Sequence, residues 1–583
     1  MPTQKLRPLA TLALLALFAS QAHAETAKPI EPGDAGAYLA AQYASAENDF
    51  RAAVGWYDRA LATDGQNATL LDGAILANIG IGDIAKAAKL AVAFEALGGK
   101  SQQSYLAIMA ERAKAGDFAA ILENTKNDPG VGALFDGLVK AWAELGNGDM
   151  TKALAGFDVV AATPGLESFG LFHKALALAS AGDFEGAAVI FSAKKGTQLT
   201  LNRRGVLAFV QVLSQLERNP EALSLMDKTF GQVTEPAIVD LRRRLTAGEP
   251  IPFDAVRNST DGIAEVFYTL GSALNGQAET NYVLLYSRIA NHLRPDNSDA
   301  MLLTAEQLET LGQHDLAAEA YAAIKPDDPS YYVAEIGRAA TTRAAGRKEA
   351  ALEILQALAR SHGDVLAVQN ALGDGLRRDE HFAEAIKAYD TAVAMLGTPN
   401  SSHWSLYYSR GICNDRLKNW DQAESDFRMA LKLEPDQPQV LNYLGYSFVD
   451  RGIHLDEALG MIQRAVAARP DEGFIVDSLA WALYRMGRFD EALAPMEKAS
   501  LLEPVDAIVT DHLGDVYWSV GRKREAEFQW HRALSFGPDE TDATRIRHKL
   551  DVGLDAVIAE EAATPTPAAE AKVAPVEPAT DGN

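Results

Sequence analysis

Three stretches of the sequence repeat one arrangement of polar and aromatic side chains. Positions i, i+4 and i+7 of these stretches hold Asn442, Tyr446 and Val449, then Asp477, Trp481 and Tyr484, then Asp511, Asp515 and Trp518. On an α-helix this spacing places each set on one face. Asn and Asp side chains hydrogen-bond a peptide backbone, aromatic rings serve as rigid anchors, and Arg485 adds a charge. We therefore predict a polypeptide-binding strip, made of Asn442, Tyr446, Asp477, Trp481, Tyr484, Arg485, Asp511 and Trp518.

A second interpretation of the same residues stays open. The indoles of Trp481 and Trp518 are large enough to pack between neighbouring helices instead of facing a ligand. The sequence does not decide between an exposed binding surface and a packed interior for these two side chains.

Catalytic and metal-binding patterns are missing from the sequence. It contains no His-Glu-x-x-His and no Gly-x-Ser-x-Gly motif, and its histidines fall at differing offsets instead of in one cluster. Residues 97–101 resemble the end of a phosphate-binding loop, but they join two predicted helices, whereas such loops follow a strand. Cys413 is the only cysteine, which excludes an intramolecular disulfide and favours a small buried side chain. We predict a protein that is not an enzyme and needs no cofactor or metal.

The elements that position the strip follow from an internal repeat. Gly487 recurs as Gly521, Ala492 as Ala526, and Pro504 as Pro538, always at the same interval. A fixed period of roughly 34 residues is typical of arrays of paired helices, in which each pair buries its apolar stripe against the next. The sequence predicts an all-α, right-handed superhelical solenoid of about 13–14 helix-turn-helix repeats. Stacked in this way, the first helices of successive pairs line an inner groove that carries the strip.

The junctions within each pair have their own signature. Glycine is followed by aspartate at Gly82-Asp83, Gly116-Asp117, Gly148-Asp149 and Gly182-Asp183. Glycine adopts the left-handed conformation that ends one helix, and aspartate caps the next. In the clearest unit we expect Asp471 to cap a helix that runs to Met486, and residues 489–502 to form the second helix.

Composition and the positions of glycine and proline divide the chain into seven segments. In order, we predict a signal peptide over 1–24, a linker over 25–33, divergent repeats over 34–246, a loop or hinge over 247–263, regular repeats over 264–538, one capping helix over 539–561 and a disordered Pro- and Ala-rich tail over 562–583.

The N-terminal segment is typical of an export signal. Lys5 and Arg7 precede a short apolar core, and Ala22-His23-Ala24 forms a small-x-small site, so we expect cleavage between Ala24 and Glu25. No later stretch reaches the length of a transmembrane helix, and no cysteine lies near the cleavage site to carry a lipid. These features predict an exported periplasmic protein that is soluble or peripherally associated with the envelope, without a lipid anchor.

The charge of the chain argues against one class of partner. Asp and Glu number 79 against 54 Lys and Arg in 583 residues, a formal net charge of −25. Nucleic-acid binding depends on clustered basic charge that replaces counterions. We therefore expect no nucleic-acid partner.

The repeat itself resembles a known family pattern. The pattern of the tetratricopeptide repeat is matched by Leu513, Gly514, Tyr517, Gly521, Ala526, Trp530, Ala533 and Pro538. The match is strong over residues 264–538 and partial over 34–245. The resemblance implies paired helices that bind other proteins or peptides.

Residues 441–459, 469–493 and 511–534 resemble, more closely, the C-terminal half of a proteobacterial cell-envelope tetratricopeptide family. Its relatives include outer-membrane lipoproteins that act as adaptors of carboxyl-terminal processing proteases and cell-wall hydrolases. This resemblance implies a periplasmic adaptor that binds an envelope protease or a cell-wall hydrolase, although the lipidated cysteine is missing here. A stable structural or assembly subunit of an envelope export or outer-membrane complex remains the alternative.

Overall fold

The computed structural model of the chain describes residues 32–127, 130–192, 199, 201–231 and 235–563. Within these residues the structure consists of helices and their connections, without a strand. The prediction of an all-α array is confirmed. The predicted signal peptide with its cleavage site at Ala24 and Glu25 lies outside the described residues, as does the predicted tail beyond residue 563.

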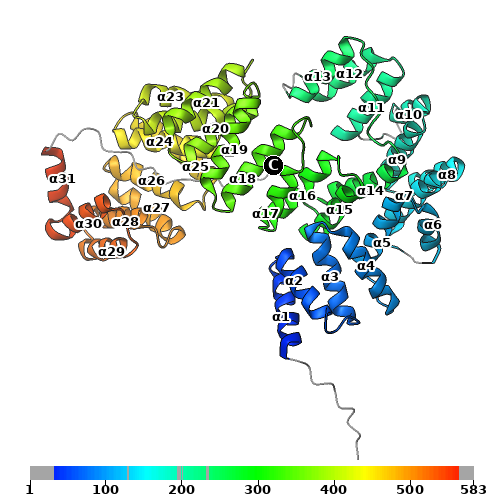
Figure 1. Cartoon of the computed structure of the whole chain (residues 1–583). Helices are drawn as coiled ribbons and strands as arrows, with labels where there is room; N and C mark the ends of the chain where they lie inside the picture. The colour runs from blue at the N-terminus through cyan, green and yellow to red at the C-terminus, as the bar shows by residue number, and fades with distance from the viewer. Residues whose placement is uncertain (1–31, 128–129, 193–198, 200, 232–234, 564–583) are drawn as a thin grey trace, which may run out of the picture. The chain divides into compact units, whose positions relative to one another are not determined.

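The chain forms two compact units, residues 1–354 and 355–583 (Figure 1). The helices of the first unit are α1 Pro32–Ala46, α2 Phe50–Leu61, α3 Ala68–Ile81, α4 Ile84–Ala96, α5 Gln102–Ala115, α6 Phe118–Asn127, α7 Ala133–Gly146, α8 Met150–Ala161, α9 Glu167–Ser180, α10 Phe184–Phe191, α11 Arg203–Gln215, α12 Asn219–Phe230, α13 Pro236–Thr246, α14 Ser259–Leu274, α15 Thr280–Leu293, α16 Ser298–Thr310, α17 His314–Ala322 and α18 Tyr331–Ala344.

The boundary between the units falls inside α19, Lys348–Ser361. The helices of the second unit are α20 Leu366–Arg378, α21 Phe382–Met395, a 3-10 turn at Ser401–His403, α22 Trp404–Arg416, α23 Trp420–Leu433, α24 Pro438–Arg451, α25 Leu455–Ala468, α26 Gly473–Arg485, α27 Phe489–Leu502, α28 Ala507–Ser519, α29 Lys523–Ser535, α30 Glu540–Val552 and α31 Leu554–Ala563.

The glycine–aspartate junctions behave as predicted. Gly82, for example, has a φ of 90° at the end of α3, and the Asp83 carboxylate accepts a hydrogen bond from the backbone N–H of Lys86 at 2.9 Å. The same aspartate cap begins α8 and α10. At α26 the prediction was wrong, because the cap residue is Glu472 instead of Asp471 and its side chain makes no capping bond.

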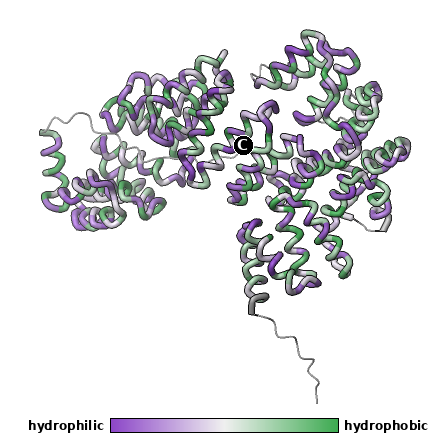
Figure 2. The backbone as a smooth tube through the Cα atoms, viewed as in Figure 1, coloured by the Kyte–Doolittle hydropathy of each residue, from purple (hydrophilic) through white to green (hydrophobic). Residues whose placement is uncertain are grey.

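Close approach of the two helices in a pair depends on a small residue in the first helix. A Cβ on Gly514 of α28 would lie 2.4 Å from the indole nitrogen of Trp530 in α29, and one on Gly411 of α22 would lie 2.7 Å from the Phe427 ring of α23. Both aromatic side chains are fully buried there. Apolar and polar residues accordingly alternate along the helices (Figure 2), as expected for helices that bury one side against their neighbours.

Two features depart from a uniform array. Residues 247–258 connect α13 to α14 and bury Ile251 and Val256, and α14 then begins at Ser259, inside the predicted interruption. Helix α14 packs against α5, α7 and α9, and α15 packs against α3, α4 and α5, helices that lie far earlier in the sequence (Figure 1).

The second departure is at the C-terminus, where the structure has two helices in place of the single predicted capping helix over 539–561. Gly553 ends α30 with a φ of 86°, and a Cβ at this position would lie 2.8 Å from the Trp518 ring. The glycine thus lets the chain turn and brings α31 against Trp518.

Candidate protein-binding face

The first helices α24, α26 and α28 of the second unit lie side by side and carry the strip. Asn442, Asp477, Tyr484 and Asp511 are buried, Tyr446, Trp481 and Trp518 are half-buried, and Arg485 is exposed. The predicted residues therefore do come together across three repeats. Their carboxylates, however, face other side chains of the chain.

Asp477 is paired with a histidine of the next repeat. The Asp477 carboxylate lies 3.0 Å from Nδ1 of His512, and both residues are more than nine-tenths buried. Burial alone would lower the pKa of His512, but the Asp477 carboxylate outweighs it, and the pKa is raised above its ordinary value. The buried pair is a charged link between α26 and α28.

Trp481 stacks on this pair. Its ring centroid lies 3.8 Å from that of His512, with 13° between the ring planes, and 4.7 Å from that of Tyr484, with 12° between the planes. Trp481 thus packs against the next repeat, and part of its ring still reaches solvent.

Asp511 and Asp515 are neutralised by α30. The ammonium of Lys549, which is fully buried, lies 2.7 Å from Asp511 Oδ2 and 2.6 Å from Asp515 Oδ1. Arg545 approaches Asp515 at 3.5 Å, and the Trp530 indole donates to Asp515 at 2.9 Å. Burial raises the pKa of Asp511, with Lys549 acting in the opposite direction.

The partners of these carboxylates were not predicted from the sequence, although the repeat period contains the signal. Arg545 and Lys549 follow Asp511 and Asp515 by one repeat period, so α30 continues the strip with opposite charge. Extending the strip by one repeat would have predicted the network.

Trp518, at the C-terminal edge of the strip, also has internal partners. Its indole nitrogen donates to Asp555 of α31 at 3.0 Å, and its ring lies 5.3 Å from that of Trp530. The ammonium of Lys523 lies 4.4 Å from the Trp518 ring centroid. Like Trp481, this side chain packs between helices while remaining partly exposed.

Arg485 is the strip residue most open to solvent. Its guanidinium donates a long hydrogen bond, 3.4 Å, to the backbone oxygen of Asp450. An exposed guanidinium beside a half-buried indole can bind a carboxylate next to an apolar side chain.

Metal sites, membrane spans and reactive thiols each have a recognisable structural signature. In the part of the chain that the structure describes, no three His, Cys, Asp or Glu side chains converge as metal ligands, and no helix is both long and apolar enough to cross a membrane. Burial raises the pKa of the Cys413 thiol to about 12, which makes it a poor nucleophile. Residues 97–101 join α4 to α5, and Ser101 caps α5.

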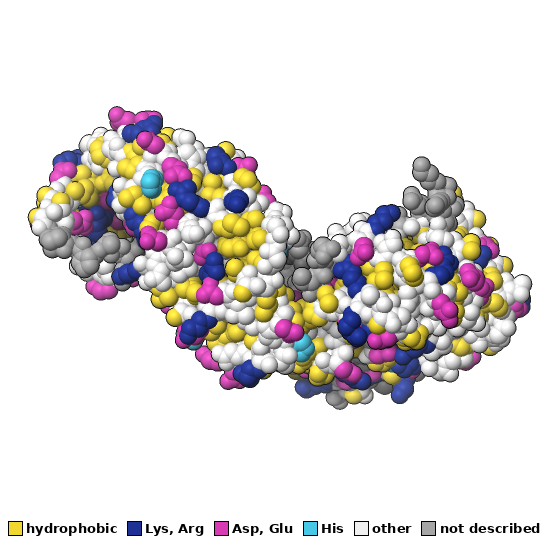
Figure 3. Space-filling view, turned by 90° about the horizontal axis from the view of Figure 1, so that it is seen from above, with side chains coloured by type: hydrophobic (Ala, Val, Ile, Leu, Met, Phe, Trp, Pro, Cys, Tyr) yellow, Lys and Arg dark blue, Asp and Glu magenta, His cyan; other side chains and the backbone are white. Residues whose placement is uncertain are grey.

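Basic and acidic side chains are interspersed on the surface, as the face in Figure 3 shows. This distribution agrees with the net charge of −25 and offers no continuous basic area on that face.

Several known proteins resemble the chain in part. The chain is 28% identical over 174 residues to a TPR repeat-containing protein of Pseudomonas aeruginosa, a match that covers 30% of this chain and 28% of the relative's own length. Among solved structures, the chain is similar to the APC/C hetero-tetramer Cut9-Hcn1 (16% identity, 90% of this chain and 97% of that one, TM-score 0.39). It is also similar to a tetratricopeptide repeat protein from Parabacteroides merdae (19% identity, 44% and 98%, TM-score 0.35).

The family model described as tetratricopeptide repeat matches residues 286–332, 370–438, 415–473 and 478–541. These ranges include α24, α26 and α28, the helices that carry the strip. Over these residues the chain matches the tetratricopeptide repeat.

Proposed function

We propose that the protein is a non-catalytic scaffold that binds other proteins through the strip on α24, α26 and α28. The observation that carries this proposal is the half-buried Trp481 followed, one turn along α26, by the exposed Arg485. Aromatic and arginine side chains together are the usual anchors of protein interfaces. The internal pairing of Asp477 with His512 fixes the ring before a partner arrives, which reduces the entropic cost of binding.

The proposal extends to location and partner. The predicted leader and the resemblance to cell-envelope relatives support a periplasmic adaptor that holds a processing protease or a cell-wall hydrolase. The alternative is a stable subunit of an envelope export or outer-membrane complex. N-terminal sequencing of the mature protein tests export, with Glu25 expected as the first residue, and an intact residue 1–24 segment would contradict it.

The adaptor role is tested by affinity purification of the tagged full chain from cell envelopes after cross-linking. We expect partners that are lost in Arg485→Glu and retained in the matched charge reversal Arg524→Glu, because Arg524 is exposed on the second helix α29, off the strip. Partners retained equally by both variants would contradict the assignment of the strip. Recovery in fixed stoichiometry without cross-linking would favour the structural subunit.

A further inference from the structure

One face of α24 carries two carboxamides that the described part of the chain leaves unsatisfied. Gln439, Asn442 and Tyr446 follow one another at three- and four-residue intervals, which places them in a row along this face. The carbonyl oxygens of Gln439 and Asn442 are buried and accept no hydrogen bond from any residue that the structure describes. Asn442 is only 4% exposed, so its unsatisfied oxygen costs stability in the free chain. We call these three residues the α24 row.

The buried carboxylates of the strip differ from Asn442 in this respect. Asp477 is paired with His512 of the next repeat, and Asp511 with Lys549 of α30. Both carboxylates therefore hold neighbouring helices together. Among the buried amide and carboxylate side chains of the strip, Asn442 is the one without a hydrogen-bond partner in the residues that the structure describes.

The chemistry of a carboxamide specifies what can satisfy it. Its oxygen accepts a hydrogen bond and its amino group donates, so the matching ligand presents an N–H and a C=O close together. In an α-helix these backbone groups are already bonded to one another, whereas in an extended chain they are free to bind a neighbour. The α24 row therefore fits the main chain of a non-helical segment.

The row also has a defined length and leads to Arg485. From Gln439 to Asp450 the helix rises about 16 Å at about 1.5 Å per residue, which matches about five residues of extended chain. At the Asp450 end, the Arg485 guanidinium of α26 donates to the Asp450 backbone oxygen at 3.4 Å. Arg485 and the α24 row thus belong to one surface.

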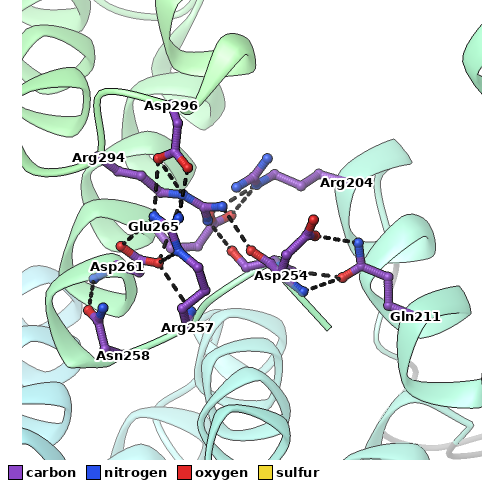
Figure 4. Close-up of polar contacts among 10 residues, drawn as sticks. Arg204, Gln211, Asp254, Arg257, Asn258, Asp261, Glu265, Arg294 and Asp296 are labelled. Atoms are coloured by element: carbon purple, nitrogen blue, oxygen red, sulfur yellow. Dashed lines mark hydrogen bonds and ion pairs between the residues drawn. The ribbon is translucent and has the colours of Figure 1, made fainter. Parts of the chain in front are cut away.

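The first unit shows a contact of this kind within the chain itself. Residues 247–258, which connect α13 to α14 without a helix, bind the first helix α11 through a carboxamide (Figure 4). The Gln211 oxygen accepts hydrogen bonds from the backbone N–H groups of Asp254 and Ala255, both at 3.2 Å. The Gln211 amino group donates to the Asp254 carboxylate at 2.6 Å.

A second residue of this segment is bound through both of its backbone groups. The Ser214 hydroxyl of α11 accepts from the Ile251 N–H at 2.9 Å, and the Gln215 carboxamide donates to the Ile251 carbonyl at 2.7 Å. The Ile251 side chain is buried. Amide and hydroxyl side chains of one first helix thus bind the main chain of a non-helical segment.

The helix face that makes these contacts is the one that carries the strip. Gln211 precedes the buried Ala222 of α12 by 11 residues, and Trp481 precedes the buried Ala492 of α27 by the same interval. Gln211 therefore occupies the repeat position of Trp481.

We propose that the α24 row binds the main chain of a non-helical segment of a partner protein, as α11 binds residues 247–258. Asn442 and Gln439 supply the hydrogen bonds that Gln211 and Gln215 supply on α11. This inference rests on the proposed function and specifies the partner segment as extended and recognised through its backbone.

The test begins with two display libraries selected on the full chain. One presents linear peptides with a fixed central proline, which prevents a helix, and the other presents randomised residues on the surface helix of a three-helix-bundle scaffold. Dissociation constants of the selected binders are measured by fluorescence anisotropy against the wild type, Asn442→Leu and the control Gln463→Leu. Gln463 is an exposed carboxamide on the second helix α25, off the strip.

We expect linear binders that lose about tenfold in affinity with Asn442→Leu, because hydrogen bonds are lost, and keep it with Gln463→Leu. The melting temperature of Asn442→Leu should not fall, since leucine replaces a buried amide that has no partner in the free chain. A side chain needed only for the fold would lower both quantities together.

The main-chain contact is tested by changing the backbone of the linear binder. Replacing one peptide bond by an ester removes a single N–H and leaves every side chain in place. At one position the ester should weaken binding to the wild type by about fivefold. The same ester should have no effect on binding to Asn442→Leu, where the hydrogen bond is already missing.

The other outcomes separate this inference from the proposed function. Binders that come only from the helical library, or linear binders that no ester weakens, would overturn the main-chain contact and leave the strip as a binding surface if they depend on Arg485. A fall in both melting temperature and affinity with Asn442→Leu would assign this residue to the fold and overturn its role. Binders insensitive to Asn442→Leu and Arg485→Glu, or none from either library, would overturn the proposed site as well. Affinity that rises tenfold or more on removal of residues 564–583 would identify the chain's own tail as the occupant and overturn a foreign segment.

Discussion

Replacing Lys549 by methionine should destabilise the C-terminal helices of the second unit more than any other single substitution around the strip. The Lys549 ammonium is fully buried and is the shared partner of Asp511 and Asp515, at 2.7 and 2.6 Å. Methionine preserves the bulk of the side chain and removes its charge. Two buried carboxylates then face each other, with Arg545 as the nearest cation, 3.5 Å from Asp515.

The size of the effect follows from the burial of the network. Removing one partner of a buried ion pair costs about 3–5 kcal/mol, and Arg545 at 3.5 Å from Asp515 places the loss toward the lower end of that range. A repeat array opens locally, so the loss should appear in α28 and α30 before the rest of the chain. We expect amide hydrogens of these helices to exchange about a hundredfold faster or more, since each 1.4 kcal/mol corresponds to a factor of ten.

Hydrogen exchange read by mass spectrometry on the full chain provides the measurement. A triple variant, Lys549→Met with Asp511→Asn and Asp515→Asn, is the matched control, and because it removes the buried charges together it should restore most of the protection. Protection in Lys549→Met equal to that of the wild type would refute the reasoning. So would a triple variant as damaged as the single one.

The same variant has a defined pH dependence. Burial raises the pKa of Asp511, and the loss of Lys549 removes the charge that acts against this rise. A carboxyl whose pKa is raised in the folded state destabilises the fold at pH values above that pKa, and the penalty disappears as the pH falls through it toward the unfolded value of about 3.9. The deficit of Lys549→Met should therefore be largest at neutral pH and shrink on acidification, and a deficit that grows in acid would contradict this.

Three further predictions concern single positions. Asp477→Asn removes the charge that raises the pKa of His512. In the wild type, the ion pair stabilises the fold fully below about pH 6.5, and this contribution is lost as the pH rises through the folded-state pKa of His512. The melting temperature of Asp477→Asn should therefore differ from that of the wild type more at pH 5.5 than at pH 9. Gly514→Ala should destabilise the fold by about 1–3 kcal/mol in urea titrations, because its Cβ would collide with the buried indole of Trp530. Gly460→Ala, which has open space around it in α25, should stabilise the fold by roughly 0.5–1 kcal/mol. Equal effects of the two variants would contradict the packing argument. Cys413, with a pKa of about 12, should resist alkylation at pH 8 in the folded chain and react after denaturation, and rapid native labelling would show that it is accessible.

The repeat made the helices predictable, because each of them is specified by residues close in sequence. The glycine–aspartate junction at Gly82 and Asp83 needs only a left-handed turn and a cap, and the predicted second helix over 489–502 is found as α27 with the same bounds. The single capping helix was wrong at Gly553, where contact with Trp518 of an earlier helix accounts for the break. The pattern of residues close in sequence does not reveal such contacts between distant segments.

The packing of α14 on α7 was beyond local pattern for the same reason. Gly262 follows Asn258, Ser259 and Thr260, residue types that favour loops, and its role as the contact of Trp142 depends on a residue far earlier in the chain. In the strip, the sequence predicted which residues share a face, but not that Asp477 and Asp511 are neutralised by partners one repeat on. Comparing successive repeats position by position recovers Arg545 and Lys549, which lie one period after Asp511 and Asp515, but not His512, which is offset by one position from Asp477.

Trp142 with His173 and Trp481 with His512 are two tryptophan–histidine pairs at the same positions of a repeat. The residue four positions before each tryptophan determines if the surrounding face is apolar or polar. Trp142 donates to Nδ1 of His173 at 3.0 Å, and burial without a carboxylate lowers the pKa of His173 to about 3. His512 is also buried, yet Asp477, in the place that Leu138 holds in the first unit, raises its pKa. A leucine there makes the face apolar enough to be sealed by α14, whereas an aspartate keeps a charged pair beside the indole and disfavours a permanent apolar cover. The same repeat position thus builds core in one unit and a half-buried face with a charged pair, our proposed binding surface, in the other.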